Sequence, residues 1–132
     1  MINRLVVCVM FSLLTAPAAH SADSKGNYAI WGAGRQSCNQ FLKAADKPEL
    51  ERFKNYLMGY LTAFNTLSED TYNITAGENL SSAVTWLKGY CDLHQIESYD
   101  RAIQQFVDEK YEARFREPPG RKQGWGQGNP TQ

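Results

Sequence analysis

The residues whose types could do chemistry gather in one short stretch, WGAGRQSC, from Trp31 to Cys38. Two glycines, an arginine, a serine and a cysteine could form a phosphate-binding loop, a nucleophilic site or the covalent anchor of a structural element. A dinucleotide-binding loop needs three glycines in the pattern G-x-G-x-x-G between a strand and a helix. Here Ser37 stands where the third glycine belongs, and no strand–helix–strand unit follows. The sequence therefore excludes a dinucleotide loop.

The chain begins with a pattern typical of a secretory signal peptide. Arg4 precedes an apolar run over residues 5–14, and small residues follow, with Ala19 and Ser21 fitting the cleavage rule. A membrane anchor is the alternative, but the run is about ten residues long and a spanning helix needs about 20. We therefore expect residues 1–21 to be removed and the mature protein to be periplasmic or secreted.

Two of the three cysteines remain after this cleavage, because Cys8 lies inside the apolar run. Cys38 and Cys91 form an even pair, and a disulfide is the default state of such a pair in an oxidising compartment. The closed loop would span 53 positions and contribute about 4 kcal/mol by chain-entropy arithmetic. The alternative is a reactive Cys38 whose thiolate is favoured by a helix N-terminus.

The sequence lacks the residues that a metal site or another catalytic site would need. A zinc site needs three or four ligands, and the mature chain has one histidine, His94, beside the two cysteines. A Cys91–His94 dyad would have no group to orient it. Acidic neighbours such as Glu69 and Asp70 are interpreted as solvated loop charges. We therefore expect no metal, no cofactor and no enzymatic activity.

Four segments are expected to form the scaffold that positions the functional residues. Their apolar residues recur at helical spacing, and no segment shows the alternation of apolar and polar residues that is typical of a strand. The first helix is expected to begin after Ser37 as N-cap, and the second to carry Pro48 in its first turn. The third is expected at about residues 80–94, and the fourth is expected to begin near Ser98 and to end by Arg116. The sequence predicts an all-α fold, a compact four-helix bundle in which one disulfide pins the first helix to the third.

Composition divides the chain into a signal peptide (1–21), a lead-in arm (22–36), a helical domain (37–115) and a disordered tail (116–132). The tail is rich in Gly, Pro and Gln and cannot build a core. The whole chain carries 14 basic and 14 acidic residues. The chain therefore has no large net charge that would attract it to nucleic acid or to an anionic membrane, and neither is an expected partner.

Two glycines interrupt the predicted helices at matching places. Gly59 lies in YLMGY (56–60) and Gly89 in WLKGY (86–90), which leaves an internal duplication open. Glycine in a helix interior costs about 1 kcal/mol relative to alanine. We therefore expect each glycine to allow the close approach of a neighbouring helix.

Candidate partner-binding residues lie outside the predicted core. Trp31 and Arg35 precede the disulfide, and the loop 68–79 is longer than most helix–helix connections. Such a loop on a rigid scaffold is a frequent contact element. The sequence predicts that a protein partner contacts Trp31, Arg35, Asp70, Tyr72 and Asn73. The alternative is that Trp31 and Tyr28 cover the end of the core.

The order of these segments resembles small bacterial periplasmic proteins that include the type VI secretion immunity proteins of the Rap/Tai group. The resemblance rests on Cys38, on Gly59-Tyr60-Leu61 and on the run Trp86 to Cys91, and it covers about residues 31–115. It implies a secreted helical protein. Some relatives block a toxic peptidoglycan amidase through a surface loop, often as dimers, so a homodimer is an expected assembly.

The favoured function is therefore a periplasmic, non-catalytic binding protein of the immunity type. The alternative is an acid-stress chaperone similar to the HdeA type, which is also small, helical and joined by a single disulfide. In that alternative, acid protonates carboxylates and exposes apolar surface.

Overall fold

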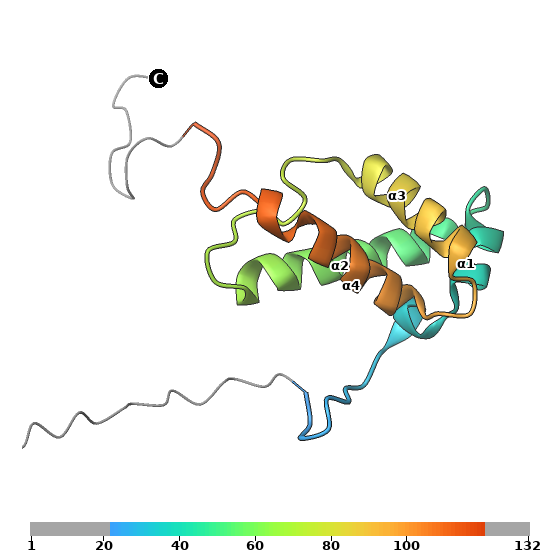
Figure 1. Cartoon of the computed structure of the whole chain (residues 1–132). Coiled ribbons are helices and arrows are strands. Elements are labelled where there is room, and N and C mark those ends of the chain that lie inside the picture. Colours follow the sequence, from blue (N-terminus) through green and yellow to red (C-terminus); the bar gives the residue numbers. More distant parts are fainter. Residues whose placement is uncertain (1–21, 121–132) are drawn as a thin grey trace, which may run out of the picture.

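A computed structural model describes residues 22–120 (Figure 1). Its elements are η1 (Gly32–Arg35), α1 (Cys38–Ala44), α2 (Leu50–Leu67), α3 (Leu80–Leu93), α4 (Tyr99–Lys110) and η2 (Tyr111–Ala113). The described residues contain four α-helices, and their only extended pairings are two isolated bridges. The predicted all-α fold is confirmed. The predicted signal peptide and the tail beyond residue 120 lie outside the described residues.

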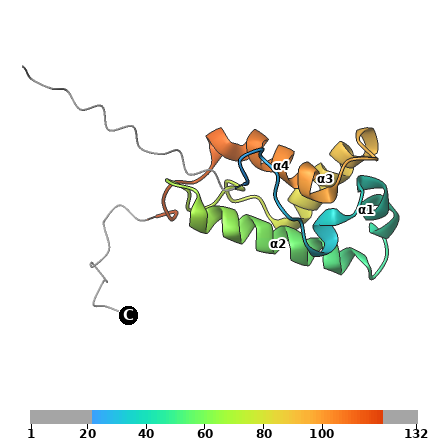
Figure 2. The ribbon, with the colours of Figure 1, turned by 90° about the horizontal axis from the view of Figure 1, so that it is seen from below.

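The helices pack in two layers around one core. Figure 2 shows α2, the longest helix, along one side and α3 and α4 on the other, while α1 lies at one end. All four helices and the loop after α2 contribute fully buried side chains, because removing apolar surface from water stabilises the folded state. The largest of them are Phe41, Phe53, Leu57, Ile74, Leu87, Tyr99, Ile103 and Phe106.

Three helices begin with a side-chain cap. The side chains of Ser37, Asn79 and Ser98 each accept a hydrogen bond from the backbone N–H three residues later, at the starts of α1, α3 and α4. Such a cap pairs one of the N–H groups that a helix start leaves unpaired. The predicted caps Ser37 and Ser98 are confirmed.

The start of α2 differs from the prediction, whereas the end of α4 lies within the predicted limit. α2 begins at Leu50 because Pro48 belongs to the preceding turn, where its carbonyl accepts from the Glu51 N–H at 3.1 Å. α4 ends at Lys110, earlier than Arg116, because the chain leaves the helix through η2 and pairs with the loop after α2. There the Phe115 N–H donates to the Asn73 carbonyl at 2.9 Å.

The disulfide joins Cys38, at the start of α1, to Cys91, near the end of α3. Both side chains are fully buried, and their Cα atoms lie 4.9 Å apart. The predicted pairing is confirmed. The bond uses the Cys38 thiol, so Cys38 is not the free nucleophile of the alternative interpretation.

The expected role of the helix glycines is wrong. A Cβ atom built on Gly59 or Gly89 would meet nothing within 4 Å, so both glycines face open space instead of a neighbouring helix. The close approach is made by Gly34 in η1. A Cβ atom there would lie 2.3 Å from the Cζ and hydroxyl oxygen of Tyr56 on α2.

Candidate functional site

Trp31 is the most exposed aromatic residue among residues 22–120. Its side chain is 80% exposed, immediately before η1, and Arg35 at the end of η1 is exposed as well. The alternative interpretation, in which Trp31 covers the end of the core, is therefore wrong for this residue. A large indole left in water loses the stabilisation that burial would give it.

The backbone around Trp31 is held in place on its C-terminal side. The Tyr99 N–H donates to the Gln36 carbonyl at 2.7 Å, and the Cys38 N–H donates to the Glu97 carbonyl at 2.8 Å. Gly34 packs against the ring of Tyr56. These contacts fix η1 to the start of α4 and to the middle of α2.

The N-terminal side of Trp31 is held by a buried carboxylate, that of Asp100 in the first turn of α4. Its side chain is 2% exposed. Oδ1 accepts from the Tyr56 hydroxyl at 2.6 Å, and Oδ2 accepts from the Tyr28 hydroxyl at 2.8 Å and from Gln104 Nε2 at 3.1 Å. Gln104 Nε2 also contacts the Tyr28 hydroxyl. We call these four residues, Tyr28, Tyr56, Asp100 and Gln104, the Asp100 cluster.

Neutral donors alone satisfy this carboxylate. Among the described residues no lysine, arginine or histidine forms an ion pair with Asp100. The start of α4 adds the partial positive charge of a helix N-terminus. Because Tyr28 lies three residues before Trp31 and Gly34 lies three after it, the arm is anchored on both sides of the exposed indole.

The same carboxylate affects the acidity of nearby tyrosines. Burial raises the pKa of Tyr56 well above its ordinary value, and the hydrogen bond to Asp100 and its charge raise it further. Burial, followed by the charge of Asp100, raises the pKa of Tyr60 to about 12. The pKa of Tyr28 is raised by burial and by its hydrogen bond to Asp100. These hydroxyls are therefore kept neutral in the folded state.

We expect the protein to lose stability in alkaline solution. A tyrosine whose pKa is raised on folding stabilises the protein fully below its unfolded value of 10.0, and that contribution disappears as the pH rises through the folded value. For Tyr60 the window runs from 10.0 to about 12. Urea unfolding at a series of pH values should show the free energy of unfolding falling across this window. In Tyr60→Phe the free energy should fall less steeply with pH. A free energy of unfolding that stays level across this window would contradict the account.

Gly34 should tolerate no side chain. In Gly34→Ala the new methyl group meets the end of the Tyr56 ring, which its hydrogen bond to Asp100 keeps from moving away. Such overpacking costs about 1–3 kcal/mol. The matched control is Gly59→Ala. This change should raise the free energy of unfolding by as much as about 1 kcal/mol, because the site is helical and open. Urea unfolding measures both, and equal effects of the two changes would contradict this packing.

The other predicted partner-binding residues lie in the loop 68–79. The side chains of Asp70 and Tyr72 are exposed, and an Asp70 oxygen lies 3.5 Å from Arg116 Nη1. The Asn73 side chain accepts from the N–H and the hydroxyl of Thr75, both at 3.0 Å. Its amide oxygen therefore shapes the loop.

The structure does not bring the five predicted residues into one site. η1 packs beside Tyr56, whereas the loop starts after Leu67, eleven residues further along α2, or about 16 Å. Figures 1 and 2 both show η1 and this loop toward opposite ends of α2. There are thus two separate surfaces, the Trp31 surface (Tyr28, Trp31 and Arg35) and the loop 68–79.

Sequence analysis missed the Asp100 cluster. Asp100 looks like an ordinary acidic residue in the first turn of a helix, where it would be solvated. One signal was present, since Asp100 follows Tyr99 and precedes Ala102 and Ile103, all of which are buried. Its partners lie 72 and 44 positions away in the sequence, at Tyr28 and Tyr56, so no local pattern connects them.

Residues 22–120 contain neither a cluster of metal-binding side chains nor a helix that could span a membrane. There, no three side chains of His, Cys, Asp or Glu come together as a metal site. No helix in this part of the chain has both the length and the apolar character needed to cross a bilayer.

Comparison of the chain with protein-family models, with curated proteins and with solved structures found no match. The site geometry and the sequence patterns therefore carry the functional argument.

Proposed function

We propose that this chain is an extracytoplasmic, non-catalytic binding protein whose protein partner contacts the Trp31 surface. The observation that carries the proposal is an indole 80% exposed on a backbone anchored on both sides. Tryptophan is enriched among the residues that dominate binding energy at protein interfaces. A segment ordered before binding loses less conformational entropy when the complex forms.

The partner that we favour is a secreted toxin such as a peptidoglycan amidase, which makes the chain an immunity protein. Two points support this choice: the resemblance to the Rap/Tai group, and an internal disulfide, which is compatible with an oxidising compartment. The partner would be inhibited by occlusion, with Trp31 inserted into its surface.

Toxin protection tests this function. Candidate secreted amidases are directed, one at a time, to the periplasm of test cells, with and without the full-length chain. Survival should depend on the chain and should be lost in Trp31→Ala. Leu93→Ala is the control, because Leu93 is 83% exposed at the end of α3. Equal killing with and without the chain would contradict an immunity function.

The Asp100 cluster favours the second candidate, an acid-stress chaperone of the HdeA type. The carboxylate of Asp100 is the charged acceptor that holds Tyr28 and Tyr56, so acid conditions that break these hydrogen bonds would release the arm. Release of the arm would then uncover the aromatic side chains beneath it. Suppression of client aggregation at about pH 2 is the measurement, and Asp100→Asn should give suppression at higher pH. A chain that leaves client aggregation unchanged in acid would eliminate this candidate.

A further inference from the structure

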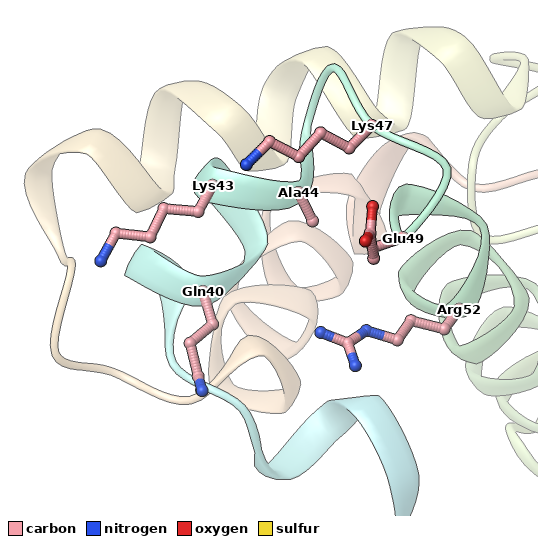
Figure 3. Close-up of a pocket in the computed structure, with 6 residues that line it drawn as sticks. All are labelled: Gln40, Lys43, Ala44, Lys47, Glu49 and Arg52. Carbon is pink, nitrogen blue, oxygen red and sulfur yellow. The ribbon is translucent and has the colours of Figure 1, made fainter.

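A basic pocket lies where α1, the following turn and the start of α2 meet (Figure 3). It has a volume of about 240 Å³. The residues that line it are Gln40, Lys43, Ala44, Lys47, Glu49 and Arg52. They carry three positive charges and one negative charge, within a chain whose basic and acidic residues are equal in number.

The positive charges of this pocket are not neutralised within the described part of the chain. Lys43, Lys47 and Arg52 form no ion pair there, and Glu49 lies within 4.0 Å of no basic nitrogen. The nearby Asp46 is bound elsewhere, by Lys88 at 3.8 Å. Like charges around one pocket repel each other, so a bound anion would stabilise them.

A second pocket gives a direct contrast. It lies between α2 and α3, and its lining includes two lysines, Lys54 and Lys88. Each has a carboxylate partner, since Lys54 lies 2.6 Å from Glu51 and Lys88 lies 3.8 Å from Asp46. Lysines at this second pocket are paired, and those at the basic pocket are not.

The basic pocket also presents positioned donors. The Arg52 guanidinium lies over the Phe53 ring, 5.1 Å from its centroid, and this contact orients it. The Gln40 side-chain oxygen accepts from the Ser37 N–H at 3.0 Å, which leaves its amide nitrogen as a donor. α2 begins here without a side-chain cap, so its positive end adds to the field.

We infer that the basic pocket binds a compact group with two or more negative charges, of the phosphate type. The lining has a net charge of +2, so a ligand with a single carboxylate would leave half of this charge uncompensated. The planar guanidinium of Arg52 can bind two phosphate oxygens at once, and the lysines act as point charges. This site is separate from the Trp31 surface and does not depend on the proposed function.

Calorimetric titration of the mature protein with inorganic pyrophosphate tests the inference. We expect saturable binding that Arg52→Gln weakens about tenfold or more, as expected when a charge-assisted hydrogen bond is lost. Lys47→Gln should weaken it as well. Glu49→Gln should tighten it, because it removes the one negative charge of the lining. Lys54→Gln is the matched control and should bind like the wild type. All four side chains reach the surface, and each variant's unfolding midpoint checks its folding.

Two further probes identify the source of the phosphate. If phosphatidic acid vesicles bind and pyrophosphate displaces them, the group is a lipid headgroup; if pyrophosphate alone binds, the ligand is soluble. Absence of pyrophosphate binding at about 10 mM would overturn the inference. So would an equal loss in Lys54→Gln and Arg52→Gln, which indicates general charge screening. Binding of oligoglutamate without binding of pyrophosphate would assign the pocket to an acidic peptide and overturn it too.

Discussion

Loss of the Cys38–Cys91 disulfide is expected to lower the free energy of unfolding by about 4 kcal/mol. The bond closes a loop of 53 positions, and the unfolded chain gains the entropy of that loop when the bond is absent. Domains of ordinary stability have about 5–15 kcal/mol in total, so the reduced protein should be marginal. Urea unfolding of the oxidised and the reduced protein measures the difference.

A double variant separates the bond from its surroundings. Cys38→Ala with Cys91→Ala removes two fully buried sulfur atoms as well as the bond, so it should be at least as unstable as the reduced wild type. Reducing agent should not change the unfolding of the double variant. A loss below about 1 kcal/mol in the reduced wild type would contradict the predicted role of the bond.

Replacement of Asp100 by alanine is expected to be the second large effect, at about 2–4 kcal/mol. Asp100→Ala leaves the hydroxyls of Tyr28 and Tyr56 and the amide of Gln104 without their shared acceptor. The arm should then loosen, since Tyr28 is its anchor ahead of Trp31. Urea unfolding measures the first effect, and amide hydrogen exchange over residues 22–36 measures the second.

Asp108→Ala is the control for Asp100→Ala. Asp108 is an exposed acidic residue on the same helix, and changes at such positions usually lie within about 0.5 kcal/mol. Hydrogen exchange over the arm should be the same in Asp108→Ala and in the wild type. If Asp100→Ala behaved like Asp108→Ala in both measurements, the Asp100 cluster would not be the anchor of the arm.

The helices and the disulfide follow from local patterns. Ser37 and Ser98 are caps because a short polar side chain can reach the N–H three residues later, which is a property of a few neighbouring residues. With Cys8 assigned to the predicted signal peptide, only one intramolecular pairing was left, that of Cys38 with Cys91. The fold class could therefore be predicted correctly.

The candidate site could be predicted only in part. Trp31 and Arg35 stood out because they precede the predicted core, and both are exposed. Their anchoring by Asp100 depends on tyrosines far away in the sequence. The glycine prediction failed for the same reason, since helical periodicity does not reveal which face of α2 or α3 meets a neighbour. Gly34, outside the α-helices, makes the close contact with Tyr56.

Binding at the Trp31 surface is measured most directly as the dissociation constant of the protein for its proposed toxin partner. Loss of a dominant interface tryptophan costs about 2 kcal/mol or more, so Trp31→Ala should weaken binding about thirtyfold or more. The control is Ile96→Ala, an equally apolar change at a side chain that is 96% exposed in the α3–α4 connection. We predict that Ile96→Ala binds like the wild type. Wild-type affinity in Trp31→Ala, or an equal loss in both variants, would contradict the proposed role of Trp31.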